Sequence, residues 1–246
     1  MGKQDPEKSR FPTESAGRSA GEEKDQPRFG AVIFDLDGTL LDTLEDLGRA
    51  MNAALLDFGY PPHPLAAYKR MVGNGLETLV VRALPTGADK EPSGRVEALT
   101  EAMRAIYQER AMEATRVYPG ICRLLAAVRA MGLKSGVLTN KPDPATQLVL
   151  RHFFPSHTFT AVQGARQGTP LKPDPTSALT MAEEFALRPE RILYLGDSDV
   201  DMQTAKAAGM YAVGAVWGFR TAEELLASGA DALCAHPQEV AALLTG

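Results

Sequence analysis

The sequence predicts an α/β protein with a doubly wound parallel sheet and a small all-α helical cap inserted after the first strand. Short apolar runs alternate with segments of helical periodicity, the order that gives parallel strands joined by right-handed helical crossovers. Between residues 44 and 116 this alternation stops and only helical patterns remain. We therefore expect a core domain formed by residues 29–43 and 117–246 and a cap domain formed by residues 44–116.

Five apolar runs are expected to form buried strands of the core. They span residues 31–34, 134–138, 159–162, 192–195 and 211–216. Between them, Ile121, Leu124 and Val128 recur at helical spacing. Pro144 and Pro175 indicate two further helices, because proline suits the first turn of a helix.

Three amphipathic stripes predict the helices of the cap. The first contains Leu47, Ala50, Met51, Ala54, Leu55 and Phe58, the second Leu76, Leu79, Val80 and Ala83, and the third Leu99, Met103, Ile106 and Arg110. Proline-containing breaks at residues 61–64 and 85–94 separate these stripes.

Residues 1–28 differ in composition from the rest of the chain. They are rich in Lys, Glu, Ser, Pro, Gly and Asp, and Phe11 is their only large apolar residue besides Met1. Such a segment cannot bury a core, so we expect a disordered N-terminal tail. It also lacks the apolar region of a secretory signal, which makes export an unfavoured interpretation.

The overall charge and composition limit the kinds of partner. A net charge of −5 and a pI near 5.5 predict no general attraction to nucleic acid or to an anionic membrane surface. No apolar run approaches the roughly 18 residues of a membrane span. Cys122 and Cys234 cannot build a disulfide framework, which fits a reducing, cytoplasmic location.

Polar residues directly follow three of the predicted strands: Asp35, Thr139 and Asp197. Ligands of doubly wound sheets bind at the carboxyl ends of the strands, so we expect these residues to share one site. Asp35 has a second carboxylate, Asp37, two residues further on. A carboxylate can attack phosphorus as a nucleophile, and a second carboxyl can protonate the leaving alkoxide and later activate water. The alternative is a strand that runs into an ordinary Asp-Gly turn.

Two carboxylates facing a phosphate dianion would repel it without a cation. Asp197 and Asp201 are candidate ligands for one, and Mg²⁺ prefers carboxylate and water oxygens. Their spacing of four residues allows both to share one helix face. The alternative is helix capping by Ser198 or Asp199, and both interpretations are compatible.

Two further positions are candidates for holding a phosphoryl group. Lys172, in the proline-stiffened segment Leu171–Pro175, is able to balance the charge of Asp35 and of the transferred phosphoryl group. Thr139 and Asn140 offer a hydroxyl and backbone N–H groups at the end of the second strand. An exposed lysine in a turn and a helix cap are the respective alternatives.

Taken in order, these segments resemble the four signature motifs of the haloacid dehalogenase superfamily, over essentially all of residues 29–246. They read DLDGT from Asp35, TN from Thr139, KPDP from Lys172 and GDSDVD from Gly196. The resemblance implies a Rossmann-like core with a small helical cap that closes over the site. It also implies that halide displacement is disfavoured here, because the dehalogenase members lack the carboxyl of Asp37.

The resemblance assigns roles to individual residues. It implies Asp35 as nucleophile, Asp37 as general acid/base, and Thr139 and Lys172 as phosphoryl-binding residues. Mg²⁺ would be held by the Asp35 side chain, the Asp37 main-chain carbonyl and Asp197, with Asp201 nearby in support.

Among the members of the superfamily, the sequence is most similar to bacterial phosphoglycolate phosphatases. The similarity lies in residues 40–43, 71–75, 139–142, 216–220 and 229–239. The residues expected at the substrate are Gly38, Thr39, Gly73, Asn74, Asn140, Lys141 and Arg220. Gly73 and Gly75 would permit a tight cap loop close to a small substrate. Lys141 or Arg220 would pair with a substrate carboxylate, the alternative for each being a structural or solvated role.

The resulting hypothesis is a Mg²⁺-dependent phosphatase that hydrolyses a small phosphorylated metabolite, 2-phosphoglycolate by preference, through an aspartyl-phosphate. A sugar-phosphate phosphatase or a phosphomutase of the same superfamily is the alternative, because no motif separates them. A non-catalytic binding module is disfavoured by the intact set of Asp35, Asp37, Lys172 and Asp197. We expect a monomer or homodimer.

Overall fold

The computed structural model describes residues 28–87, 94–110 and 112–245. Residues 1–27 of the predicted tail, and residues 88–93 within the second predicted break, lie outside this description. Arg28, which we assigned to the tail, packs on the core. Its guanidinium carbon lies 4.3 Å from the ring centre of Tyr211 and 4.9 Å from that of Phe29.

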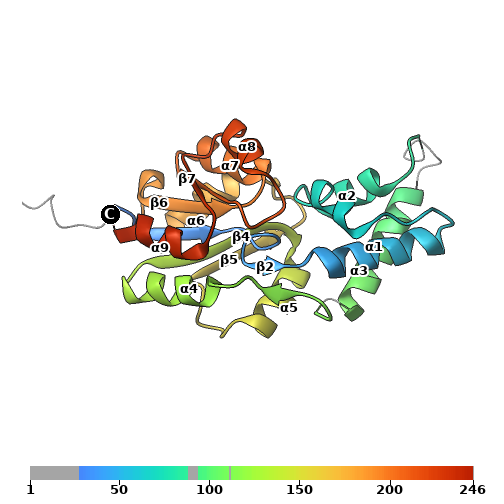
Figure 1. Cartoon of the computed structure of the whole chain (residues 1–246), viewed down its shortest axis with the longest axis horizontal. Helices are drawn as coiled ribbons and strands as arrows, with labels where there is room; N and C mark the ends of the chain where they lie inside the picture. Colours follow the sequence, from blue (N-terminus) through green and yellow to red (C-terminus); the bar gives the residue numbers. More distant parts are fainter. Residues whose placement is uncertain (1–27, 88–93, 111, 246) are drawn as a thin grey trace, which may run out of the picture.

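Within the described residues, a six-stranded parallel sheet forms the centre of the protein, in the order β5-β4-β1-β6-β7-β8 (Figure 1). Its strands are β1 (Ala31–Phe34), β4 (Lys134–Pro142), β5 (Ala161–Ala165), β6 (Ile192–Gly196), β7 (Tyr211–Ala215) and β8 (Ala232–Cys234). The predicted doubly wound α/β fold is confirmed. The chain runs outward from β1 through β4 to β5, then returns to β6 on the other side of β1.

Helices cover both faces of this sheet. One face is covered by α4 (Ile121–Ala130), α5 (Asp143–Phe153) and α9 (Pro237–Thr245). The other face is covered by α6 (Thr176–Glu184), α7 (Asp199–Ala207) and α8 (Ala222–Ala227). The short 3-10 helix η3 (Pro189–Arg191) precedes β6. Strand side chains alternate between the faces, as the pleat requires. Val32 and Phe34 pack in the first layer, whereas Ala31 and Ile33 pack in the second.

A helical segment is inserted between β2 (Leu41–Asp42) and β3 (Arg116–Val117), which pair as a two-stranded antiparallel ribbon. It consists of α1 (Leu44–Asp57), η1 (Leu65–Arg70), α2 (Leu76–Ala83) and α3 (Arg95–Arg110). Figure 1 shows it projecting beyond the end of the sheet. We call it the cap. It has its own apolar core, because the buried faces of α1, α2 and α3 pack together.

The stripes of α1 and α2 face the cap core, with Phe58 and Leu76 only partly buried, whereas the stripe of α3 is offset from the prediction. The buried residues of α3 are Leu99, Thr100, Met103 and Tyr107, whereas Ile106 is only partly buried and Arg110 is exposed. A turn of 3.6 residues makes Tyr107 as good a continuation from Met103 as Ile106, and packing against the core decided between them.

Three strand details also differ from the sequence expectations. β8 was missed, because three residues at a sheet edge carry too short a pattern to read. β4 continues beyond Leu138 to Pro142 through an irregular register with β5. β5 begins at Ala161 and not at Phe159, whose ring instead packs edge-on against Phe154, 5.5 Å between ring centres. None of the described helices is long and apolar enough to cross a membrane.

Candidate active site

The predicted site residues meet where the strand order reverses. Asp35 follows β1 and Asp197 follows β6. Thr139 lies within β4, two residues beyond its last pairing with β1 at Val137, and β4, β1 and β6 are neighbours in the sheet. The Asp35 N–H still bonds to the Leu195 carbonyl at 2.9 Å, so the sheet ladder fixes the backbone at this position. The site therefore occupies the crevice expected of a doubly wound fold.

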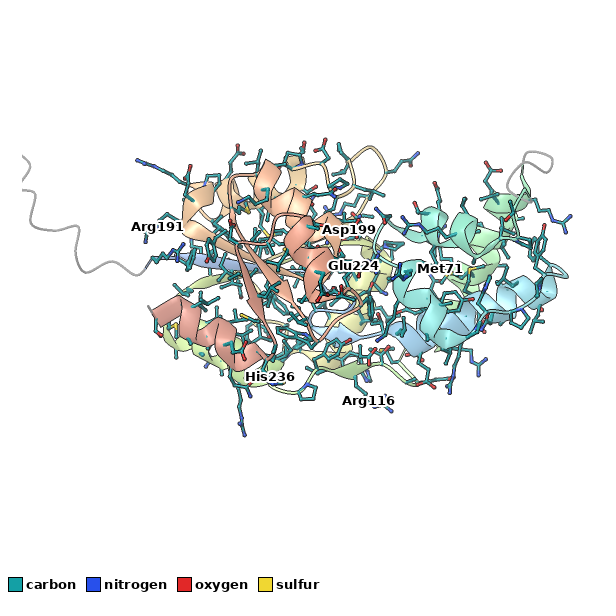
Figure 2. All side chains as sticks on the ribbon, turned by 45° about the horizontal axis from the view of Figure 1, so that its top comes forward. Met71, Arg116, Arg191, Asp199, Glu224 and His236 are labelled. Carbon is teal, nitrogen blue, oxygen red and sulfur yellow. The ribbon has the colours of Figure 1, made fainter. Side chains whose placement is uncertain are left out.

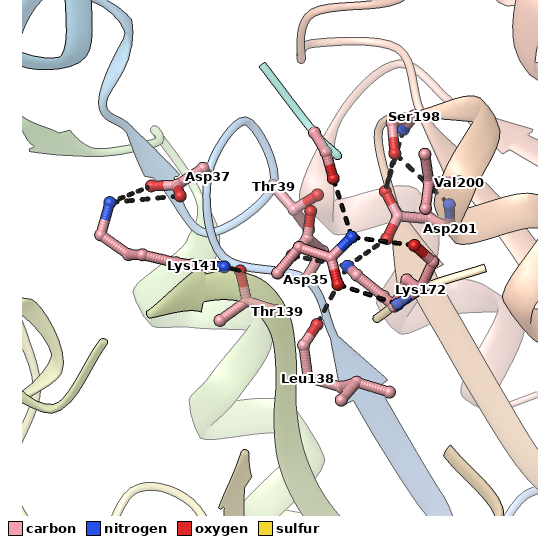
Figure 3. A network of polar contacts seen from close by, with 12 residues as sticks. Asp35, Asp37, Thr39, Leu138, Thr139, Lys141, Lys172, Ser198, Val200 and Asp201 are labelled. Atoms are coloured by element: carbon pink, nitrogen blue, oxygen red, sulfur yellow. Dashed lines mark hydrogen bonds and ion pairs between the residues drawn. The ribbon is translucent and has the colours of Figure 1, made fainter. Parts of the chain in front are cut away.

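Lys172 lies at the centre of a buried charge network behind Asp35 (Figure 3). Its ammonium is 2.9 Å from Asp35 Oδ1 and 2.6 Å from Asp201 Oδ1, and it donates to the Leu138 carbonyl at 3.1 Å. Burial disfavours the charge, but Asp201 and Asp35 outweigh it and raise the pKa of Lys172 well above its usual value. Lys172 is therefore a permanent cation beside Asp35.

Asp201 holds this lysine and also begins a helix. Its Oδ2 accepts hydrogen bonds from the Ser198 N–H (3.0 Å) and hydroxyl (2.5 Å), and Ser198 Oγ accepts from the Asp201 N–H in return. This capping box starts α7. The capping alternative for this segment is thus realised together with a role at the site. Both carboxylate oxygens of Asp201 already have partners within the protein.

Asp197 is fixed from two sides. Its Oδ1 accepts from the Thr39 hydroxyl at 2.9 Å and its Oδ2 from the Phe219 N–H at 2.8 Å. Gly38 has a φ of +91°, and a Cβ there would stand 2.2 Å from Asp197 Oδ2, so only glycine fits. Gly38 and Thr39, expected at the substrate, thus support Asp197 and do not line the cavity described below.

Three carboxylates, those of Asp35, Asp197 and Asp201, have oxygens within 4.8 Å of one another, with one lysine among them. Burial, the charge of Asp201 and, to a lesser degree, that of Asp35 raise the pKa of Asp197 well above its usual value. Asp35 Oδ1 contacts Lys172 as an ion pair but accepts no well-directed hydrogen bond. An excess of buried carboxylate oxygen with an unsatisfied acceptor fits a hard divalent cation such as Mg²⁺.

Asp37 points away from this cluster, toward Lys141 (Figure 3). The Lys141 ammonium lies 3.1 and 3.2 Å from the two Asp37 oxygens and 4.4 Å from the ring centre of Tyr107 on α3. Burial opposes the charge of Lys141, but Asp37 outweighs it and raises the pKa of the ammonium. The side chain of Asp37 is therefore outside the predicted metal cluster, and Lys141 is a buried cation beside the predicted acid/base.

Thr139 and Asn140 both line the cavity but differ in their bonding. Thr139 Oγ1 accepts from the Lys141 N–H at 3.2 Å, which leaves its O–H available to a ligand. The Asn140 side chain donates to the Gly73 carbonyl at 3.1 Å and the Lys172 carbonyl at 3.0 Å, and accepts from the Lys172 N–H at 2.9 Å. Asn140 therefore joins the cap loop to the lysine segment.

A cavity of about 220 Å³ lies between the cap and the core. Asp35, Asp37 and residues 139–142 line it from the core, together with Pro144 and Ala145; the cap contributes Leu47, Val72, Gly73, Gly75, Leu76, Leu79, Met103, Arg104, Tyr107 and Gln108. It is smaller than the roughly 300–1,000 Å³ of pockets for drug-sized ligands. The space suits a small metabolite, and most of its lining is apolar.

Arg220 and Asn74 do not line this cavity. Arg220 donates to the carbonyls of Lys69 and Val72 (3.0 Å for Val72) in the cap and pairs with Asp199 in the core at 3.4 Å. Figure 2 shows Asp199 on the core side of this boundary and Met71 on the cap side. The structural alternative for Arg220 is therefore realised. Asn74 Oδ1 is buried and has no hydrogen-bond partner among the described residues.

The sequence analysis expected Gly73 and Gly75 near the substrate, but it did not identify the other cap residues of the cavity, among them Tyr107. Tyr107 continues the stripe of Leu99 and Met103, so periodicity marks it as buried. Nothing local indicates that this face meets the active site, because the position of α3 over β4 is a tertiary property.

Comparisons with known proteins agree with this architecture. Residues 32–215 match the family model described as haloacid dehalogenase-like hydrolase. A protein from Pseudomonas putida named phosphoglycolate phosphatase is 37% identical over 191 residues, covering 76% of this chain and 70% of its own. A protein of the same name from Mannheimia succiniciproducens is 34% identical over 198 residues, covering 78% and 88%.

Solved structures show the same likeness. A crystal structure from Haemophilus somnus, described as that of a "predicted phosphoglycolate phosphatase", superposes with a TM-score of 0.81 at 28% identity, covering 87% of this chain and 96% of the other. The strand-end carboxylates, the buried lysine and the family match lead to one conclusion: this chain belongs to the haloacid dehalogenase-like hydrolases.

Proposed function

We propose that this hydrolase is a Mg²⁺-dependent phosphatase that cleaves 2-phosphoglycolate to glycolate and phosphate through an aspartyl-phosphate on Asp35. The observation that carries the proposal is the position of Asp35 at a small cavity between cap and core, paired with a permanent cation and followed two residues later by Asp37. A buried carboxylate in this setting is suited to attack a phosphoryl group rather than to stabilise the fold.

The reaction is two successive displacements at phosphorus. In the first, a carboxylate oxygen of Asp35 forms a bond to phosphorus while the bond to the alkoxide breaks, and Asp37 gives its proton to the leaving oxygen. In the second, Asp37 removes a proton from water, whose oxygen attacks phosphorus and releases Asp35 and phosphate. Lys172 offsets the negative charge of Asp35, and the Thr139 hydroxyl is free to bind a phosphoryl oxygen.

The metal would be held by Asp35, Asp197 and the main-chain carbonyl of Asp37. Asp201, whose oxygens are already bonded, would act mainly through Lys172. When bound, Mg²⁺ supplies positive charge that stabilises the transferring phosphoryl group. This role fits the surplus of carboxylate over cation in the cluster.

The choice of substrate rests on cavity size and on Lys141. A cavity of about 220 Å³ suits a substrate of few atoms. Lys141 presents a buried ammonium in the cavity wall, which is a partner for a second anionic group such as a carboxylate. The relatives named phosphoglycolate phosphatase support the same choice.

A substrate panel tests the proposal. Phosphate release with Mg²⁺, and with EDTA as the control, is measured for 2-phosphoglycolate, ethyl phosphate and a set of sugar phosphates. We expect the highest kcat/KM for 2-phosphoglycolate and no turnover in EDTA. Better turnover of a sugar phosphate would refute the substrate, and isomerisation of one without phosphate release would identify a phosphomutase.

A cytoplasmic location, the cap boundaries at residues 44 and 116, and the monomeric or homodimeric state remain predictions.

A further inference from the structure

Tyr107 is a buried tyrosine whose hydroxyl has no acceptor among the described residues, because the Lys141 ammonium beside it can only donate. Only 5% of the residue is exposed, and it lines the cavity between cap and core. A buried tyrosine hydroxyl usually finds a partner, and an unpaired one carries a free-energy cost that calls for an explanation. A hydrogen-bond acceptor on a ligand in the cavity would be such an explanation, because Tyr107 lines the cavity.

The surroundings of Tyr107 define the kind of group it would meet. Its ring lies 4.4 Å from the Lys141 ammonium, which faces Asp37 on its other side. Burial raises the pKa of Tyr107 above its usual value, so the hydroxyl remains protonated and able to donate. A neutral donor and an ammonium in one apolar wall form a site for an oxygen acceptor, best of all an anionic one.

Arg104 is the competing cation on the cap side of the cavity. It forms an ion pair with Glu101 at 2.5 Å, and 40% of its side chain is exposed. Its charge is therefore partly balanced and screened by solvent. Tyr107, by contrast, lines the same cavity with a buried hydroxyl, and a hydrogen bond to a buried group discriminates strongly between substrates.

We infer that Tyr107 is a substrate-binding and specificity-determining residue whose hydroxyl donates a hydrogen bond to the non-phosphate end of the substrate, beside Lys141. The identity of that group as a carboxylate rests on the proposed function. The inference that the substrate has a hydrogen-bond acceptor at this position does not rest on the proposed function.

The test compares two substrates that differ only at this end. Ethyl phosphate carries a methyl group where 2-phosphoglycolate carries its carboxylate. Tyr107→Phe keeps the ring over Lys141 and removes only the hydroxyl. We expect kcat/KM for 2-phosphoglycolate to fall roughly 10- to 100-fold, mainly through KM, and that for ethyl phosphate to change less than about threefold.

Tyr68→Phe is the matched control. Tyr68 is a fully buried cap tyrosine whose hydroxyl donates to Asn52 Oδ1 at 2.7 Å, away from the cavity. We expect Tyr68→Phe to leave the ratio of the two kcat/KM values unchanged. An unchanged ratio in Tyr107→Phe as well, or an equal fall for both substrates, would overturn the inference.

The outcome for Tyr107 is separable from the outcome for the proposed substrate. If the wild-type enzyme prefers another ester of the panel, the proposed substrate fails. Tyr107→Phe is then compared on that ester and on its counterpart with an alkyl group at the far end. A selective loss would still support the inference, and equal kinetics for the pair would reject it.

Discussion

The Asp35 carboxylate is buried beside two other carboxylates and a single ammonium group. Burial raises its pKa to about 7, the charge of Asp201 adds to this effect, and Lys172 opposes it. Without a bound cation, the site therefore has more negative charge than it can hold at neutral pH. The same surplus makes the site suited to a divalent ion and then to a phosphoryl group.

Replacing Asp35 by Asn tests its role as the nucleophile. Asp35→Asn keeps the shape but replaces the carboxylate by a neutral amide that is a poor nucleophile, so we expect kcat to fall at least about 1,000-fold. Phosphate release measures the loss, and circular dichroism checks that the fold is retained. Activity within tenfold of the wild type would rule out Asp35 as the nucleophile.

The pH dependence of stability is a second prediction at this scale. The folded pKa of Asp35, about 7, lies above its ordinary value of 3.8. The folded protein thus binds more protons than the unfolded chain between these two values, and stability falls as pH rises through them. Urea unfolding in EDTA at several pH values should show this decline, and the decline should be smaller in Asp35→Asn. Equal slopes for both proteins would contradict the shift.

At the scale of elements, the joint between core and cap depends on Asp46 of α1. Its carboxylate accepts hydrogen bonds from the Ala114 N–H (2.9 Å), the Thr115 N–H (2.8 Å) and the Thr115 hydroxyl (2.6 Å), just before β3. These bonds fasten the chain where it returns from the cap. The ribbon of β2 and β3 holds the same crossing on the core side.

We expect Asp46→Ala to lower the free energy of unfolding by roughly 2–4 kcal/mol, because it leaves buried donors unpaired. Urea denaturation measures this change. Glu45→Ala is the control: Glu45 is the exposed neighbour, and its ion pair with Arg49 contributes about 0.5 kcal/mol or less. Equal effects of the two substitutions would show that the Asp46 bonds do not support the fold.

At the scale of the whole molecule, the cavity exists only while the cap rests on the core. Arg220 connects the two by binding two cap carbonyls and Asp199, and Asn140 binds the Gly73 carbonyl. Both contacts hold the Gly73 loop against the cavity. Arg70 and Glu224 also meet across this boundary, but at 3.8 Å and largely in solvent.

Arg220→Ala should weaken closure of the cap. We expect KM to rise roughly tenfold for 2-phosphoglycolate and equally for ethyl phosphate, because the loop is loosened for every substrate. Arg70→Ala, the control at the same boundary, should change KM less than about twofold. Steady-state kinetics measures these KM values. A rise in KM confined to 2-phosphoglycolate would mean that Arg220 binds the substrate carboxylate instead.

The sheet, the helical insertion and the candidate chemistry could be predicted from the sequence. Buried parallel strands, helical stripes and strand-end carboxylates are local patterns, so Asp35 and Asp197 could be proposed without coordinates. Lys172 was proposed from its proline-stiffened segment and from the order of the motifs. The apolar faces of α1 and α2 could be predicted for the same reason. The offset face of α3 and the missed β8 show the limit, since short or ambiguous patterns are settled by packing.

Which side chains share the site and which support it depends on contacts between distant parts of the chain. Gly38 and Thr39 brace Asp197, Asp201 holds Lys172, Arg220 binds the cap, and Tyr107 reaches the cavity from a helix some seventy residues after Asp35. Strand ends in a parallel sheet converge by rule, so the reaction centre is readable from sequence. The position of a cap helix over that centre depends on long-range packing, so the contacts that select the substrate are not.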